Sequence, residues 1–115
     1  MAISKEDLLK MRARLNARAD ELLVNKGNDY NSQQQEAGDT LFNLRACFLL
    51  GIVGSPVDGI LVRMSDKMQR LISLTRANVV QKVKDESLED TVVDLRNYAD
   101  YLLAMVKEAK GQPIE

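Results

Sequence analysis

The chain has no histidine and only one cysteine among its 115 residues. Without histidine it cannot build a His-ligated zinc site, a Ser-His or Cys-His nucleophile pair, or an imidazole general base. Cys47 lies in an apolar run, and one cysteine can form neither a disulfide nor a thiolate zinc cluster within a chain. A metal ion would therefore have to be a hard cation held by carboxylates, such as Mg²⁺ or Mn²⁺.

Aromatic residues are also scarce, and the charges nearly balance. Phe, Tyr and Trp make up 4% of the chain, too few for a platform on which the bases of a single strand stack. A net charge of −1 lacks the basic excess that binds a nucleic acid polymer. The most apolar run (41–54) is too short to span a bilayer, and the first ten residues show no signal-peptide pattern. We therefore expect a cytoplasmic protein that binds neither membranes nor nucleic acid polymers.

Apolar residues recur at helical spacing, and several residues mark helix ends. Ser4, Ser55 and Ser87 are placed to cap helices, and Gly27 and Gly111 are placed to end them. The pattern predicts helices over residues 5–26, 40–53, 56–78 and 88–110, with a polar loop over 27–39.

No segment has a strand pattern that is stronger than these helix patterns, so the predicted fold class is all-α. We expect a single domain over residues 1–115, a compact four-helix bundle-like fold. The helix predicted over 40–53 is apolar on nearly every side, so it should be central or sandwiched between subunits. The outermost face of the third predicted helix carries Val62, Ser65, Gln69 and Ser73, which also suggests a subunit contact. We therefore expect a homo-oligomer.

Two polar lines run along the last two predicted helices. On the third helix the line is Arg63, Asp66, Lys67 and Arg70, about 125° around the helix from its apolar centre. On the fourth helix a line is offset by about 145° from the apolar centre, and it consists of Asp90, Asp94, Asn97 and Tyr101. Such lines flank the core instead of pointing away from it, which predicts a polar groove between two neighbouring helices. The alternative is an interhelical ion network, for which Asp94 with Arg70 is the first pair to test.

Arg45 strengthens the prediction of a polar site. It falls on the same face as Leu41 and Phe48, where a buried guanidinium needs a carboxylate, a carbonyl or a bound anion. Snorkelling of the side chain to the surface is the alternative. Tyr30 and Tyr98 could stack on a base or ribose.

Two chemistries suit such a groove. Carboxylates four residues apart, such as Asp90 and Asp94, could share Mg²⁺ with phosphate oxygens. Basic side chains along one helix could instead hold phosphates directly through charge-assisted hydrogen bonds. Both favour a phosphorylated small molecule as the ligand.

Three blocks in this order resemble the nucleotide-modification-associated domain 1 family, small helical proteins frequent in bacteriophage genomes. They are KGNDY (26–30), RMSDKMQRL (63–71) and ESLEDTVVDLRNYA (86–99), within a match over roughly residues 20–105. Asn31 replaces the glycine that often follows the first block, and Asn tolerates the left-handed backbone such a turn needs. The resemblance implies a functional groove formed by Asp29, Tyr30, Arg63, Asp66, Lys67, Arg70, Glu86, Asp90, Asp94, Asn97 and Tyr98.

The family is similar in outline to the MazG-type all-α nucleoside triphosphate pyrophosphohydrolases. Those enzymes bind magnesium through an E-x-x-E helix and an E-x-x-D helix. Here Asp90 and Asp94 are spaced by four, and the first motif is replaced only by Glu36 and Asp39 in a predicted loop. This departure argues against a two-metal hydrolase.

Three functions remain as hypotheses. The first is a protein that binds a nucleotide or nucleotide-derived ligand, handling modified nucleotides or sequestering a defence signal in a phage setting. The second is a Mg²⁺-dependent nucleoside triphosphate pyrophosphohydrolase with Asp90, Asp94 and either Glu86 or Glu89 as metal ligands. The third is a structural helical oligomer whose polar lines are ion pairs.

Overall fold

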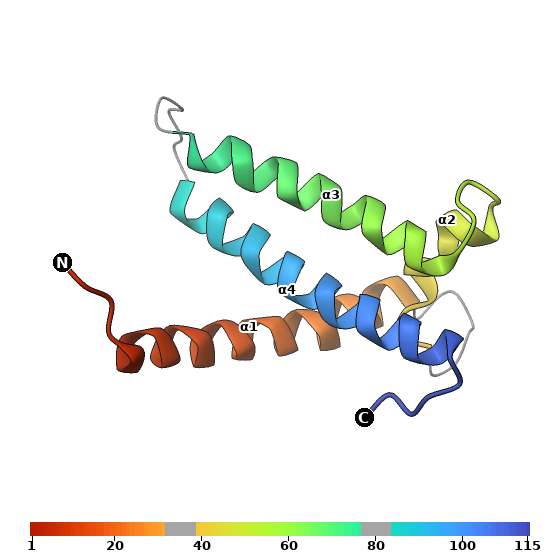
Figure 1. Ribbon diagram of the computed structural model, residues 1–115, viewed down its shortest axis with the longest axis horizontal. Coiled ribbons are helices and arrows are strands. Elements are labelled where there is room, and N and C mark those ends of the chain that lie inside the picture. Colours follow the sequence, from red (N-terminus) through yellow and green to blue (C-terminus); the bar gives the residue numbers. More distant parts are fainter. Residues whose placement is uncertain (32–38, 77–83) are drawn as a thin grey trace.

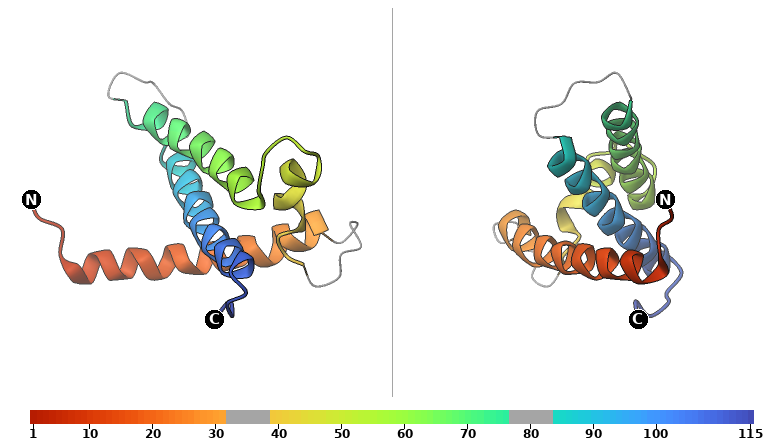
Figure 2. Two further views of the ribbon diagram at one scale, coloured as in Figure 1. Left: turned by 45° about the vertical axis from the view of Figure 1, so that its right-hand side comes forward. Right: turned by 90° about the vertical axis from the view of Figure 1, so that its left-hand side faces the viewer.

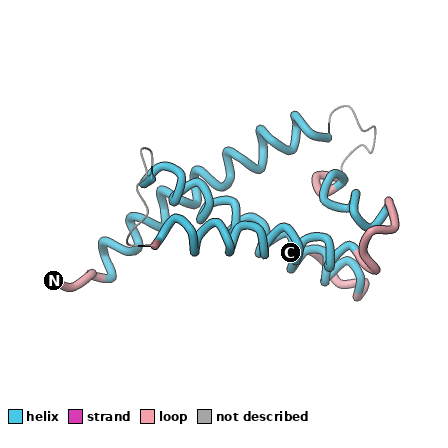
Figure 3. The backbone as a smooth tube through the Cα atoms, turned by 90° about the horizontal axis from the view of Figure 1, so that it is seen from above, coloured by secondary structure: helices cyan, strands magenta, loops and turns pink. Residues whose placement is uncertain are grey.

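The computed structural model describes residues 1–31, 39–76 and 84–115, and the side chains of 26–31 and 84–87 lie outside that description. Its helices are α1 (Lys5–Asn31), the 3-10 helix η1 (Phe42–Arg45), α2 (Ala46–Leu49), α3 (Pro56–Thr75) and α4 (Lys84–Ala109). No strand occurs in these ranges, which confirms the predicted all-α, bundle-like fold (Figures 1 and 3). No helix of the described part is both long and apolar enough to cross a membrane.

Helix α4 lies between α1 and α3. It packs side by side with antiparallel α3, while α1 crosses its other side (Figures 1 and 2). Within the described ranges no Cα atom of α1 comes within 8 Å of one in α3, and η1 packs against both helices at one end of the molecule. Within the described ranges α1 and α3 are therefore connected through α4 and, at one end, through η1.

The buried core is small and is centred on α4. Leu15 and Ala19 of α1 pack with Val93 of α4, and Leu22 covers the edge of this cluster. Ile60 of α3 is also completely buried. Because α4 packs against both α1 and α3, it needs apolar residues on each of the two faces that meet these helices.

Several helix ends match the sequence pattern. The hydroxyl of Ser4 accepts the Asp7 amide at 3.0 Å, and that of Ser55 accepts the Asp58 amide at 3.2 Å. Gly111 has φ +67° and ends α4 in a left-handed conformation that glycine adopts without steric cost. These three predicted signals are confirmed.

Three predicted boundaries were wrong. Helix α1 continues through Gly27 to Asn31, because glycine inside a helix costs only about 1 kcal/mol and does not oblige the helix to stop. Helix α4 begins at Lys84, so Ser87 lies inside its first turns and does not cap it. The acidic residues that precede Ser87 suit a helix N-terminus and explain the earlier start. Helix α3 ends at Thr75, earlier than the predicted residue 78.

The helix predicted over 40–53 is the largest correction. The chain forms η1 and then the four-residue α2, which Gly51 ends with φ +77°. The Gly51 amide donates to the Phe48 carbonyl at 2.9 Å, and the Ile52 amide donates to the Cys47 carbonyl at 2.8 Å. This hydrogen-bond pair is the Schellman motif, a common helix end that Gly51 makes possible. Side chains such as Phe48 and Ile52 are exposed, so the segment is not central within the chain.

Candidate functional site

A cavity of about 520 Å³ opens where α1, α3 and α4 meet the segment that contains η1. Its size falls within the range typical of small-molecule sites. The lining residues come from four parts of the chain: Leu22, Leu23, Thr40, Leu41, Asn43, Leu44, Ala46, Arg63, Lys67, Asp94, Asn97, Tyr98 and Tyr101. Leucines of α1 and of segment 41–44 form an apolar side, and α3 and α4 supply a polar side.

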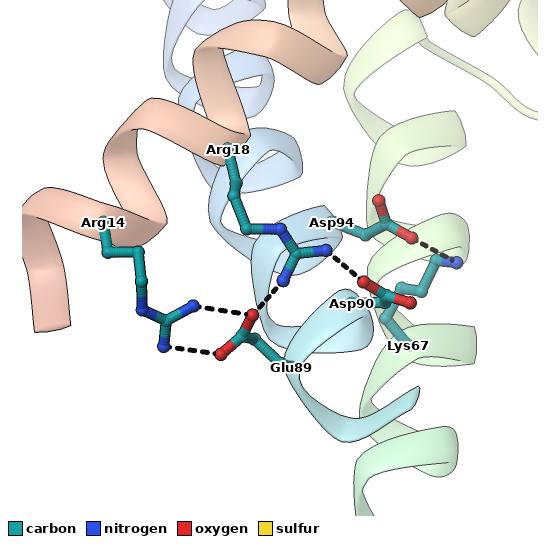
Figure 4. A network of polar contacts seen from close by, with 6 residues as sticks. All are labelled: Arg14, Arg18, Lys67, Glu89, Asp90 and Asp94. Atoms are coloured by element: carbon teal, nitrogen blue, oxygen red, sulfur yellow. Dashed lines mark hydrogen bonds and ion pairs between the residues drawn. The ribbon is translucent and has the colours of Figure 1, made fainter. Parts of the chain in front are cut away.

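Two cations and one carboxylate define the charge of the polar side. The Lys67 ammonium contacts the Asp94 carboxylate at 3.1 Å, and both side chains are about three-quarters buried (Figure 4). Arg63 lies one turn before Lys67 on α3 and has no ion pair or hydrogen bond with any described residue. The cavity therefore presents a guanidinium that no carboxylate of the described part neutralises.

The rest of the polar side carries uncharged donors and acceptors. The Asn97 carboxamide donates to the Ala19 carbonyl of α1 at 3.1 Å, which fixes its position and leaves its oxygen as an acceptor. The rings of Tyr98 and Tyr101 pack edge to face with centroids 5.9 Å apart. Burial, and secondarily the charges of Tyr98 and Asp94, raise the pKa of Tyr101. Its phenol therefore stays protonated and able to donate at neutral pH.

Asp90, predicted to share a groove with Asp94, faces α1 instead. Arg18 of α1 donates to both Asp90 and Glu89 (Figure 4). Arg14 adds two hydrogen bonds to Glu89, at 2.6 and 2.9 Å. The hydrogen bond from Arg14, with smaller contributions from Arg18, lowers the pKa of Glu89. The two carboxylates of the polar line on α4 therefore have different partners: Asp90 binds α1 and Asp94 binds α3.

Arg45 is matched by carboxylates, as the sequence required of a buried guanidinium. Its Nε donates to Asp39 at 2.9 Å, and its Nη1 donates to Glu108 of α4 at 2.7 Å. The hydrogen bond to Glu108, followed by that to Asp39, raises the pKa of Arg45. Arg45 does not line the cavity, but it ties the segment that forms one cavity wall to the end of α4.

The remaining predicted residues divide into three groups. Those that line the cavity are Arg63, Lys67, Asp94, Asn97 and Tyr98. Asp66 and Arg70 are exposed on α3 outside the lining, and Asp94 pairs with Lys67, one turn earlier than Arg70. The side chains of Asp29, Tyr30 and Glu86 lie outside the described residues. No group of three or more potential metal ligands gathers within the described part of the chain.

Sequence reasoning missed the contribution of α1 and of segment 40–46. Leu22 follows Leu15 and Ala19 at helical spacing, and that spacing alone gave no sign that it would also line a cavity. Arg14 and Arg18 stand four residues apart beside Leu15 and Ala19, a spacing that could have suggested a basic line facing a carboxylate. No spacing rule could have shown that this line would meet Glu89.

The chain has no significant match to a protein-family model, to a curated protein or to a solved structure. The resemblance of three sequence blocks to the nucleotide-modification-associated domain 1 family therefore stays a prediction. Function is inferred from the cavity itself.

Proposed function

We propose that the protein binds a nucleotide or a nucleotide-derived small molecule in the cavity between α1, α3, α4 and η1. The observation that supports this most directly is the half-apolar cavity in which Arg63 has no described partner. A phosphate group would satisfy that guanidinium through charge-assisted hydrogen bonds. Lys67 stands one turn away and would add donors to the same anion.

Other residues of the cavity lining suit the organic part of such a ligand. Tyr98 and Tyr101 offer ring surface and phenol donors, and leucines such as Leu22 and Leu44 offer apolar contact. Both kinds of contact favour a base or ribose over a simple inorganic anion. The role that follows is binding without turnover, either sequestering a nucleotide signal or handling modified nucleotides, as the sequence resemblance also suggests.

A homo-oligomer is part of the same proposal. The accessible surface of the chain is 8509 Å², against about 6,300 Å² for a compact monomer of this mass. The exposed side of α3 carries large apolar residues: Leu61, Val62, Met68 and Ile72. A second copy packed on this surface would remove these apolar side chains from water.

A thermal-shift panel tests the binding function. Purified protein is melted with mono-, di-, tri- and cyclic nucleotides and with ADP-ribose-type compounds, with and without Mg²⁺. At a ligand concentration of about 100 Kd we expect about 2.7 kcal/mol of stabilisation, a rise of several degrees in Tm. Chromatography should recover the nucleotide intact, whereas Mg²⁺-dependent loss of it would favour the hydrolase.

Two arginine variants test whether the nucleotide binds in the cavity. Arg63→Gln removes the guanidinium that has no partner among the described residues and should weaken binding about 10- to 100-fold. Arg12→Gln removes the same charge from an exposed position on α1 outside the cavity and should leave the response unchanged. An equal response in wild type and Arg63→Gln, with both proteins folded, would contradict the proposal.

A further inference from the structure

The charged groups that line the cavity limit how much negative charge a ligand can bring. Arg63 and Lys67 contribute two positive charges and Asp94 one negative charge, so the described residues of the lining carry one net positive charge. Residues four apart on a helix have Cβ atoms about 6 Å apart. The two cations therefore stand close enough to hold oxygens of one phosphate group.

Lys67 can take part without giving up Asp94. An ammonium has three donors, and the 3.1 Å contact with Asp94 uses one of them. The Asp94 carboxylate keeps free lone pairs in turn, which can accept a hydrogen bond from a hydroxyl or amino group of the ligand. A phosphate and a neighbouring donor would then bind on opposite sides of one ion pair.

Each additional phosphate would be bound less favourably, because the electrostatic attraction of the cavity is limited. A second or third phosphate adds negative charge near Asp94, and the described residues of the lining include no further cation to offset it. Because the Lys67–Asp94 pair is largely buried, this repulsion is screened less than it would be at the surface.

We propose that the cavity selects ligands with a single phosphate group and an adjacent hydroxyl or amino donor, as in a nucleoside monophosphate. This inference rests on the proposed nucleotide-binding function and narrows its ligand class. Arg63 and Lys67 hold the phosphate, Asp94 accepts from the sugar hydroxyls, and Tyr98 and Tyr101 contact the base. Because cationic side chains of the protein neutralise the charge of the phosphate, we expect an affinity that does not depend on Mg²⁺.

Titration calorimetry with matched ligand series tests this selectivity. For each of four bases, the full-length protein is titrated with the nucleoside and its mono-, di- and triphosphate, with and without Mg²⁺. Ribose 5-phosphate and inorganic phosphate are included to separate the contributions of sugar and base. We expect the monophosphate to bind tightest within the best series, with the nucleoside and the triphosphate each at least tenfold weaker.

Asp94→Asn gives a second readout that depends on the charge count. The substitution raises the charge of the lining by one and preserves the shape of the side chain. The triphosphate should gain about tenfold or more relative to the monophosphate, since the added negative charge no longer faces a carboxylate. Glu21→Gln removes one carboxylate from an exposed position on α1 outside the cavity and should leave the ratio unchanged.

The outcomes separate the two proposals. Tighter binding of the triphosphate by wild-type protein, or binding that requires Mg²⁺, overturns the single-phosphate inference while nucleotide binding stands. An unchanged triphosphate-to-monophosphate ratio in folded Asp94→Asn also overturns it. If no compound of the series binds to folded wild-type protein, the proposed function fails and this inference fails with it.

Discussion

Glu89 receives hydrogen bonds from two arginines of α1, and this one carboxylate carries much of the polar contact between α1 and α4. Arg14 binds it with both terminal nitrogens, and Arg18 bridges from it to Asp90. Charge-assisted hydrogen bonds of this kind favour the ionised carboxylate. The contact between the two helices therefore depends on the protonation of Glu89.

We predict that part of the stability of the fold is lost in acid because of Glu89. Its pKa in the folded protein is lower than the ordinary glutamate value of 4.5, so the unfolded chain binds more protons below that pH. The stabilisation is complete above about pH 5 and disappears as pH falls through the lowered pKa. Urea unfolding at several pH values should show wild type more stable than Glu89→Gln at pH 7, and the difference should shrink below 4.5.

Glu21→Gln is the matched control, because Glu21 is exposed on the same helix as the two arginines. Its stability should follow the wild-type pH dependence. A difference between wild type and Glu89→Gln that stays constant from pH 7 to pH 3 would contradict the role given to Glu89.

Helical spacing was the basis for predicting individual residues of the site, and it predicts only which face of a helix a residue lies on. The offset polar line on α3 pointed to both Lys67 and Arg70, and only Lys67 lies in the cavity. The line on α4 joined Asp90 to Asp94, but a helix with a neighbour on each side sends adjacent turns to different partners. Spacing places residues on one face of a helix and leaves open which neighbouring helix that face meets.

At the scale of elements, the short segment from Asp39 to Ala46 forms a wall of the cavity without a long helix of its own. Arg45 fixes this segment through Asp39 on one side and Glu108 of α4 on the other. Leu41 and Leu44 of the same segment line the cavity. The position of the wall therefore depends on a side chain that does not itself line the site.

We predict that Arg45→Gln weakens ligand binding as well as stability. The loss of charge-assisted bonds at a largely buried guanidinium should lower the free energy of unfolding by about 1–3 kcal/mol. A displaced wall should also raise the Kd of the best nucleotide severalfold. Urea unfolding measures the first effect, and calorimetry measures the second.

Glu108→Gln is the matched control for this variant. It removes only the half-exposed partner and keeps the pair with Asp39, so its effects should be smaller. Unchanged nucleotide affinity in folded Arg45→Gln would show that the wall does not depend on this contact.

Helix ends show which elements the sequence specifies locally. Ser55 with Pro56, and Gly111 after the last turn of α4, gave correct boundaries because capping depends on a few adjacent residues. The segment 40–53 was misread because its apolar composition fits a long helix, yet Gly51 ends it after a single turn of α2. Gly27 was misread in the opposite direction, since α1 passes through it.

At the scale of the whole molecule, the single chain leaves much apolar surface uncovered. Its radius of gyration is 16.3 Å, against about 13 Å for a compact domain of this length. The N-terminal turns of α1 extend beyond α4 and expose Leu8 and Leu9 (Figure 2). The all-α class was predictable from periodicity alone, whereas this open shape follows from tertiary packing that periodicity does not encode.

We predict that the protein is an oligomer in solution and that the exposed face of α3 contributes to the interface. Light scattering after size exclusion should give a mass of at least twice the 12.9 kDa of one chain. Met68→Glu together with Ile72→Glu places two charges on this face, which is exposed in the monomer, and should shift the mass toward 12.9 kDa without unfolding the helices.

Lys110→Glu, at the exposed end of α4, serves as the control and should keep the wild-type mass. A wild-type mass of 12.9 kDa at concentrations up to about 100 µM would contradict the prediction. An unchanged assembly in the double variant would exclude this face of α3 from the interface.

The lack of contact between α1 and α3 in the described ranges has a consequence for how the cavity responds to its contents. Leu22 and Arg63 line the cavity from helices that are connected through α4 and η1, so we expect a bulkier ligand to increase their separation by moving α1 relative to α4. Such a movement would strain the ion pairs that Arg14 and Arg18 make with α4, and dissolved salt weakens partly exposed ion pairs of this kind. We therefore expect ligand size and ionic strength to affect the same contact, the one between α1 and α4.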